Sequence, residues 1–333
     1  MKVAELRKKL SDMPKEDVSR LAVEFYKMIP KSKKKDYALD DLINNPKKRK
    51  KRKKKEDIDL EQLESDIDIF IEHARAQYYV APNQVIPKRE RPKWRFEVMR
   101  WYKTLINVKK PDADIDLQIR LLVKLYELLC EASSFYLFST DDPFRSVQIT
   151  QTDFFKSILM LYDTSGNKVK LADKGFELLS ENNLDRYSLH SGIADAYIGF
   201  LPTPDLKNRV IDLCEAKIRE IDYKPPKKER STWSFNEDYK TRNQNNNLAI
   251  LGFRIYCSLY EADEAIHFFK KHYYGNSAEI KTYVLIYQLL HHNLKDEIIR
   301  ELKDARKNGV ELRDRLKNLQ SIIENSGKLP DYI

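Results

Sequence analysis

The chain has 333 residues, which is long enough to bury a core in two parts. It contains only eight glycines, well below the usual share of about 7%. Gly-rich phosphate loops and dinucleotide-binding folds need several glycines and are therefore not expected. The 61 basic and 52 acidic residues give a net charge of +9. An all-helical chain is the first expectation.

No window approaches the roughly 18 consecutive apolar residues that cross a membrane, and the first residues lack the apolar region of a secretory segment. We therefore expect a cytoplasmic protein without membrane association. The three cysteines, Cys130, Cys214 and Cys257, lie far apart within helical patterns. They are expected to be buried reduced thiols.

The first clear helical pattern follows Pro14. Its apolar residues are Val18, Leu21, Ala22, Phe25, Met28 and Ile29. This spacing places them on one face of a helix. We predict N-terminal helices over residues 1–45.

Nine consecutive basic residues follow, and without them the chain has 52 basic and 52 acidic residues. From Glu56 to Glu72 the charge reverses, with eight acids and no Lys or Arg. A run of like charge is usually a solvated, disordered loop, and we predict such a basic loop over residues 46–56. Alternatively, the run could grip nucleic-acid phosphates, act as a nuclear import signal or touch an anionic membrane.

A central helical domain is predicted over residues 57–222. The acids at its start accompany an apolar stripe of helical period, so they fall on a solvated helix face. From Asp114 to Ser134 only a narrow polar stripe remains, which predicts a helix surrounded by others. Further helices are expected at about 149–162, 168–181, 187–200 and 204–221.

A linker is predicted over residues 223–247. Pro225-Pro226 and a polar string from Asn243 to Asn247 mark it. Five helices are expected beyond it, in a C-terminal domain over residues 248–333.

The C-terminal helices contain an internal repeat. Asp263–Lys270 aligns with Asp296–Lys303 at an offset of 33 residues, close to the period of about 34 residues of helix-turn-helix repeats. The spacing of Tyr256, Ala265 and Phe269 resembles that of tetratricopeptide repeats, with an irregular stack of hairpins as the alternative. The predicted fold class is all-α, an irregular, α-solenoid-like stack of helical hairpins of the tetratricopeptide or HEAT kind.

Basic and aromatic residues alternate between Lys88 and Lys103, where Trp94 and Trp101 lie. This patch could hold a phosphate backbone or an acidic peptide, although buried Trp covered by Arg stems is the commoner outcome. Together with the basic tract, it supplies the candidate contacts to nucleic acid or to an acidic partner. They are Lys47, Lys48, Arg49, Lys50, Lys51, Arg52, Lys53, Lys54, Lys55, Arg89, Arg91, Lys93 and Arg95.

Several short motifs carry a family resemblance. They are Val3–Leu10, Tyr26, Asn44-Asn45-Pro46, Arg91-Pro92-Lys93-Trp94-Arg95-Phe96, Cys130-Glu131 and Asp141-Asp142-Pro143-Phe144. Over about residues 1–180 the chain resembles a bacterial family of small helical proteins of unknown function. The resemblance implies an all-α fold and a bacterial source, and it implies no activity.

The sequence predicts no catalytic residue, cofactor or metal ion. Its six histidines have no Cys or carboxylate at the short spacings of zinc sites. The main functional hypothesis is a non-enzymatic helical-repeat protein that binds a protein partner along a concave surface. The alternatives are a nucleic-acid-binding protein that uses residues 47–55 and an enzyme whose site is assembled from scattered helices.

Overall fold

The structure is a computed structural model, and it describes residues 3–36, 39–44, 59–80, 93–107, 114–185, 190–221, 232–326 and 329–330. Internal contacts divide the chain into two compact units, Met1–Ile58 and Asp59–Ile333. The described residues form helices and contain no strand, only isolated bridges at Phe138. The predicted all-α fold is confirmed. No described helix is long and apolar enough to cross a membrane.

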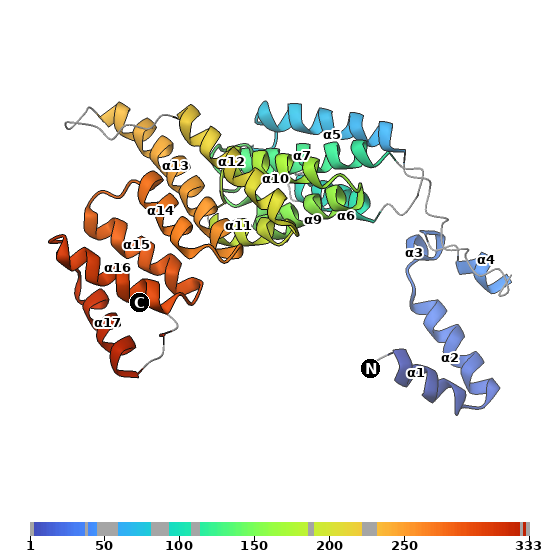
Figure 1. Cartoon of the computed structure of the whole chain (residues 1–333). Coiled ribbons are helices and arrows are strands. Elements are labelled where there is room, and N and C mark those ends of the chain that lie inside the picture. The colour runs from blue at the N-terminus through green and yellow to red at the C-terminus, as the bar shows by residue number, and fades with distance from the viewer. Residues whose placement is uncertain are drawn as a thin grey trace. The chain divides into compact units, whose positions relative to one another are not determined.

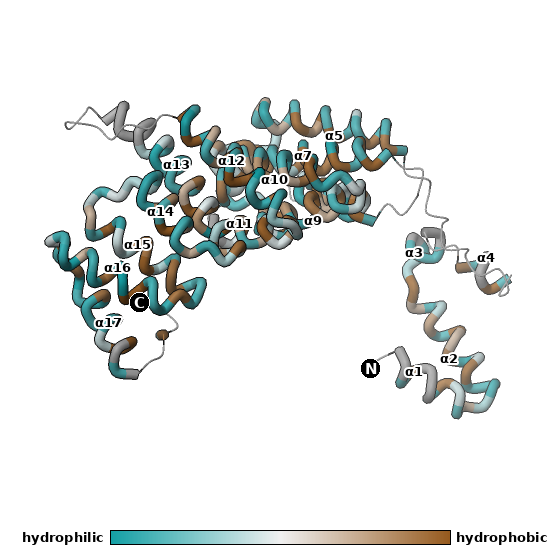
Figure 2. Tube along the Cα trace, in the orientation of Figure 1, coloured by the Kyte–Doolittle hydropathy of each residue, from teal (hydrophilic) through white to brown (hydrophobic). Residues whose placement is uncertain are grey.

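The first unit consists of short helices: α1 (Val3–Ser11), α2 (Lys15–Met28), α3 (Lys31–Asp36) and α4 (Leu39–Asn44) (Figure 1). The hydroxyl of Tyr26 on α2 donates to Asp40 on α4. Hydrophobic and hydrophilic residues are interspersed along α2 (Figure 2). Among the described residues, none on α2 is buried, and Met28 is 76% exposed. The apolar stripe is therefore formed as predicted, but no described side chain of this unit covers it.

The second unit runs from α5 to α17. The helices are α5 (Leu60–Arg75), α6 (Trp94–Ile106), α7 (Ile115–Ala132), α8 (Pro143–Ser146), α9 (Gln151–Thr164), α10 (Lys168–Glu181), α11 (His190–Ile198), α12 (Pro204–Ile221), α13 (Thr232–Ser258), α14 (Ala262–His272), α15 (Ala278–His291), α16 (Lys295–Lys307) and α17 (Asp314–Ser326).

The core of the first part of this unit is built around α7. Asp114 begins this helix because its carboxylate accepts a hydrogen bond from the backbone N–H of Leu117, which satisfies one of the free donors of the first turn. α5, α6 and α9 all pack against α7. Most of its circumference is buried, including Leu121, Leu125 and Leu129. This matches the helix that the sequence predicts to be surrounded by others.

The second part is a row of antiparallel helices. α13 packs on α14, α15 on α16, and α16 on α17 (Figure 1). Tyr260 and Asn293 lie in the two hairpin turns, both with positive φ, 65° and 57°. These positions are 33 residues apart, so the backbone repeats with the period of the sequence. The hairpins and their repeat are observed, while the tetratricopeptide resemblance stays a prediction.

The predicted linker over residues 223–247 is wrong in its second half. α13 begins at Thr232 and continues without interruption to Ser258. The amides of the polar string explain this, because they bond to backbone groups of neighbouring segments. Asn245 Nδ2 donates to His272 O at 2.6 Å, and Asn246 bonds both the N–H and the C=O of Tyr274. The string therefore holds the end of α14 instead of forming a loop.

Candidate functional site

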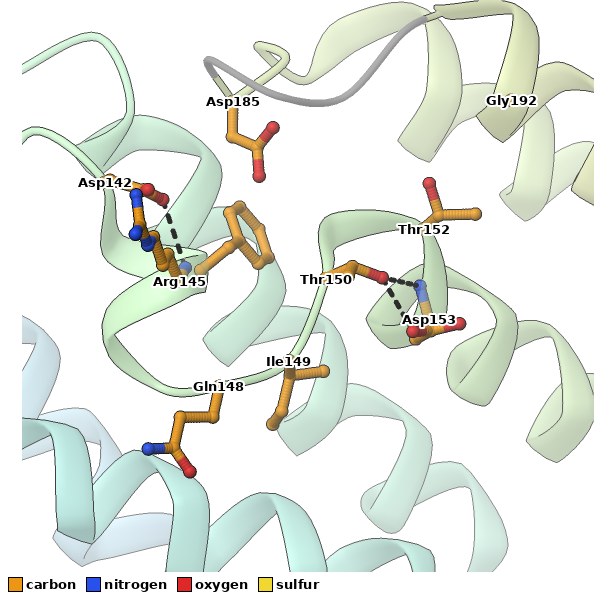
Figure 3. Close-up of a pocket in the computed structure, with 10 residues that line it drawn as sticks. Asp142, Arg145, Gln148, Ile149, Thr150, Thr152, Asp153, Asp185 and Gly192 are labelled. Atoms are coloured by element: carbon orange, nitrogen blue, oxygen red, sulfur yellow. Dashed lines mark hydrogen bonds between the residues drawn. The ribbon is translucent and has the colours of Figure 1, made fainter.

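A pocket of about 800 Å³ lies where α8, the start of α9 and the start of α11 meet. Figure 3 shows the side chains around it. Its volume falls within the range of about 300–1,000 Å³ that is typical of ligand sites. Fully buried Phe144 and half-buried Ile149 supply its apolar wall, and Asp142, Asp153 and Asp185 supply carboxylates.

Asp142 is placed by the turn that starts α8. Its Oδ1 accepts a hydrogen bond from the backbone N–H of Arg145 at 3.1 Å, and its own N–H donates to Thr140 Oγ1. Pro143 takes the first helical position, where a missing N–H costs nothing. Asp142 is only 8% exposed as a residue, and its Oδ2 is shielded from solvent without a hydrogen-bond partner.

The opposite wall is the first turn of α9. Thr150 caps this helix, because its Oγ1 accepts from the N–H of Asp153 at 3.0 Å and also bonds the carboxylate of that residue at 2.7 Å. The chain reaches Thr150 through Gln148, which has a φ of 58°. For a residue with a β-carbon, this left-handed conformation costs about 1 kcal/mol of conformational energy. The turn that imposes it on Gln148 is stabilised by the hydrogen bond from the Ile149 N–H to the Phe144 C=O.

Asp185 is held by a buried side chain behind the pocket. The Oε1 of Gln151 accepts from the N–H of Asp185 at 2.9 Å, and its Nε2 donates to Asn183 O at 2.8 Å. Gln151 is completely buried, so this bridge fixes the segment after α10. In Figure 3 the carboxylate of Asp185 points from that segment toward the space between Asp142 and Thr152.

The nearby thiol has no nucleophilic character. Gln151 Nε2 lies 3.2 Å from Cys130 Sγ. Burial raises the pKa of Cys130 to about 12, which keeps it protonated at neutral pH. The described lining of the pocket includes three carboxylates, Asp142, Asp153 and Asp185, and the guanidinium of Arg145. The described residues contain no group of three or more His, Cys, Asp or Glu that could hold a metal ion.

A second hollow, of about 520 Å³, lies between α7 and α10 and contains charges that already pair with one another. Lys170 Nζ is 2.6 Å from Asp116, and Lys174 Nζ is 2.6 Å from Glu177. Burial raises the pKa of Glu127 there. The charges of this second hollow are therefore engaged in ion pairs among its own lining residues.

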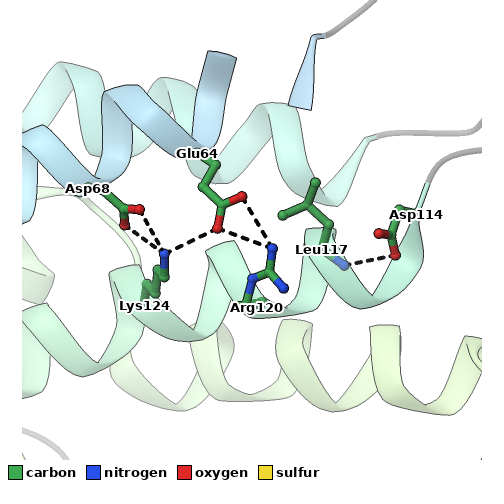
Figure 4. A network of polar contacts seen from close by, with 6 residues as sticks. All are labelled: Glu64, Asp68, Asp114, Leu117, Arg120 and Lys124. Atoms are coloured by element: carbon green, nitrogen blue, oxygen red, sulfur yellow. Dashed lines mark hydrogen bonds and ion pairs between the residues drawn. The ribbon is translucent and has the colours of Figure 1, made fainter. Parts of the chain in front are cut away.

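The acidic face of α5 is also engaged. Figure 4 shows Glu64 and Asp68 of α5 facing Arg120 and Lys124 of α7. Lys124 Nζ lies 2.7 Å from Asp68 and 3.3 Å from Glu64, and Arg120 Nη2 lies 3.1 Å from Glu64. The predicted solvated face is therefore partly an ion-pair interface between two helices.

The site residues predicted from the sequence lie elsewhere. The tract from Lys47 to Lys55, with Arg89 and Arg91, falls outside the described residues. Lys93 and Arg95 are exposed at the start of α6, and the Arg95 guanidinium lies 4.9 Å from the Phe96 ring centre. Trp94 is buried and stacks on Phe138 with ring centres 4.0 Å apart. Trp94 and Trp101 are therefore core residues, which agrees with the expected burial of these tryptophans, although the arginine that lies over a ring here covers Phe96.

The pocket at Asp142 was not predicted. Asp142-Pro143 and Thr150 are visible in the sequence as helix starts, yet Asp185 comes from a segment more than 30 residues away. No spacing rule brings them together. Comparison with known proteins finds no matching family model, no matching curated protein and no matching solved structure.

Proposed function

We propose that this chain is a non-enzymatic helical protein that binds a protein partner, and that the pocket at Asp142 takes a segment of that partner. The pocket itself carries the proposal, because it combines an apolar wall with a few buried polar groups. Its lining comes from α8, the first turn of α9 and the start of α11, and a site held by packed elements lowers the entropy cost of holding a bound segment.

The pocket is tested by filling it. Thr152 lies on the first turn of α9 and lines the pocket, whereas Thr164 lies at the other end of the same helix and is exposed. A random displayed-peptide library is selected against the full chain, and the selected peptides are measured against Thr152→Trp and Thr164→Trp. We expect Thr152→Trp to weaken binding at least about tenfold, or about 1.4 kcal/mol, and Thr164→Trp to leave it unchanged.

Two results would contradict this proposal. In the first, the wild-type chain selects no peptide above background. In the second, the selected peptides bind both Trp variants as well as they bind the wild type. Circular dichroism and the melting temperature of each variant show whether the fold is intact.

A second candidate function is nucleic-acid binding by the first unit. Residues 1–58 carry 20 basic and 10 acidic residues, against 41 and 42 in residues 59–333. The net positive charge of the chain therefore lies entirely in the smaller unit, and such a concentration of basic residues favours binding to nucleic-acid phosphates. Its test is the salt dependence of binding, argued in the Discussion.

A further inference from the structure

The geometry points to Tyr260 as the anchor for a basic segment of a protein partner, which is bound by the tyrosine ring and by the carboxylates beside it. Tyr260 lies in the turn between α13 and α14, and it is 97% exposed. Its φ is 65°. This surface shares no residue with the pocket at Asp142, and the inference does not depend on that pocket.

The turn at Tyr260 is held by its backbone. Two hydrogen bonds close it, from the N–H of Tyr260 to Cys257 O and from the next N–H along the chain to Tyr256 O, both at 3.0 Å. The turn between α15 and α16 repeats both bonds at the same length around Asn293. None of these bonds uses a side chain, so the same turn forms with Tyr or with Asn at this position.

A tyrosine is an unfavourable residue for this backbone conformation. Glycine and asparagine tolerate the left-handed region, whereas a bulky residue there is an outlier. Among the described residues with positive φ, Tyr260 is the only aromatic one. A side chain that is 97% exposed gains no packing to offset the strain. Because strained residues cluster at binding and switch sites, the tyrosine is better explained by an interaction than by the fold.

An exposed tyrosine has the properties of an interface anchor. Its ring offers a large contact area, and only two χ angles must be fixed when a partner binds, which keeps the entropy cost low. Tyrosine is also enriched among the residues that carry most of the energy of protein interfaces. Tyr260 presents nearly all of its side chain in this way.

The charges that follow Tyr260 are acidic. Glu261 begins α14, and Asp263 and Glu264 lie in its first turn. Asp263 pairs with Arg300 at 2.6 Å. In the described part of the chain, Glu261 and Glu264 are exposed and form no ion pair. Acids in a first turn also stabilise the helix, so the tyrosine carries the inference and the acids select the charge of the partner.

A cationic side chain of the partner uses both features. Its head group gains a cation–π interaction on the tyrosine face, which is stronger for arginine than for most other groups, and it complements the free carboxylates. Half-buried Lys207 of α12 is basic, but its Nζ donates to Ser258 O at 3.1 Å and supports the turn. Nucleic-acid phosphates would be repelled by the acids, which favours a basic protein segment as the occupant.

The test measures three blocked peptides on the full chain, by NMR shifts or by fluorescence anisotropy. They are Arg-Gly-Arg-Gly-Arg and its counterparts with Lys or Gln in place of every Arg. We expect the Arg peptide to bind most tightly and the Gln peptide at least about fivefold more weakly. The Lys peptide should fall between them.

The variant that isolates the ring is Tyr260→Asn, which introduces the residue of the equivalent turn. We expect it to weaken binding of the Arg peptide about threefold or more. It should also raise the melting temperature by about 1–3 °C, because asparagine tolerates the left-handed region. The matched control is Tyr136→Asn, at another exposed tyrosine, 55% exposed, and it should bind the Arg peptide as the wild type does.

The acids are tested by the double variant Glu261→Gln, Glu264→Gln. It should weaken binding of the Arg and Lys peptides and leave that of the Gln peptide unchanged, because only the cationic peptides gain from the carboxylates. The control neutralises two exposed acids near the start of α17, Glu311→Gln with Asp314→Asn. Its binding of all three peptides should equal that of the wild type.

The inference is overturned if the Arg and Gln peptides bind the wild type equally. It is also overturned if Tyr260→Asn binds the Arg peptide as the wild type does, or if this variant lowers the melting temperature, which would make the tyrosine a structural residue. Self-association of the wild type that Tyr260→Asn abolishes, measured by sedimentation velocity, would identify a second copy of the chain as the occupant and overturn the basic segment. None of these results changes the outcome of the Thr152→Trp test, so the two proposals fail separately.

Discussion

Arg254 on α13 and Asp195 on α11 form an ion pair in which the guanidinium is almost completely buried. The Arg254 side chain is 1% exposed, and its Nη1 lies 2.5 Å from Asp195 Oδ1. Its Nε also donates to Gln288 on α15 at 3.0 Å. One side chain therefore connects three helices and joins the first part of the second unit to its C-terminal hairpins.

Removing the carboxylate should destabilise the fold strongly. Breaking a buried pair leaves an uncompensated charge, which typically costs about 3–5 kcal/mol. Because Asp195 is itself half-exposed, we expect Asp195→Ala to lower the free energy of unfolding by about 3 kcal/mol, measured by denaturant titration. The control is Asp263→Ala, since the Asp263–Arg300 pair is exposed on both sides and should cost less than about 1 kcal/mol. Equal losses in the two variants would contradict the role given to Arg254.

Gly252 on α13 is required by the close approach of α14. A β-carbon at this position would lie 2.3 Å from Cε1 of Phe268, whose ring is buried. Overpacking of a core usually costs about 1–3 kcal/mol, so Gly252→Ala should lower the melting temperature.

Two further variants check this explanation. Gly192→Ala, at a helical position with no atom within 4 Å, should be neutral or stabilising, because glycine weakens a helix by about 0.5–1 kcal/mol. Replacing the ring in the double variant Gly252→Ala, Phe268→Leu should make the Ala substitution less costly than it is beside Phe268. If Gly252→Ala is as well tolerated as Gly192→Ala, the contact with Phe268 does not constrain this position.

His292 makes stability depend on pH. Burial lowers its pKa from 6.5 to about 4, with the charges of Arg254 and His291 acting in the same direction and Asp195 opposing them. The unfolded chain therefore takes up a proton that the folded chain excludes. Stability from this group is present above pH 6.5 and is lost as the pH falls toward 4.

The variant His292→Phe keeps a ring beside Phe253 and removes the titrating group. We expect a flatter dependence of the free energy of unfolding between pH 7 and pH 4 in this variant, measured by denaturant titration at each pH. Some slope should remain, because burial also lowers the pKa of His272. A variant His292→Phe whose slope equals that of the wild type would contradict the prediction.

The sequence predicted the helices well where one period of apolar residues dominates. The bounds expected for α10 and α12 agree with the structure, and the 33-residue repeat reappears in the turns at Tyr260 and Asn293. It failed where polar side chains are buried. In the sequence, Asn245 and Asn246 are typical of a loop. Their side-chain amides bond backbone groups of His272 and Tyr274, at and just after the end of α14, and these partners are visible only in the structure.

The pocket was missed for a related reason. The sequence marks Asp142 and Thr150 as helix starts, and local geometry fixes them. Asp185 reaches the same pocket because Gln151, an ordinary polar residue in the sequence, is buried and bonds its N–H. A long-range contact of this kind has no periodic signal, so the sequence indicated the helix starts but not the site that they form.

The acids beside the basic tract are less available to it than the sequence indicates. Asp59 caps α5 through the N–H groups of Glu61 and Gln62, and Glu64 and Asp68 pair with cations of α7. The tract itself lies outside the described residues. Nucleic-acid phosphates therefore compete with fewer free carboxylates than the eight in the neighbouring block.

If the tract binds nucleic acid, the logarithm of the binding constant for duplex DNA should fall linearly with the logarithm of salt concentration, by about 0.9 per phosphate contact. Replacing Lys50, Lys51 and Arg52 by Ser should flatten this slope by about two to three units, and the melting temperature should stay nearly unchanged. The control removes the same charges from α16 at exposed Lys303, Arg306 and Lys307, and its slope should equal that of the wild type. Absence of binding to DNA or RNA at about 50 mM salt would exclude the nucleic-acid function, because phosphate contacts are strongest at low salt. A marked fall in melting temperature in the tract variant alone would instead identify the tract as a structural partner of the acidic block.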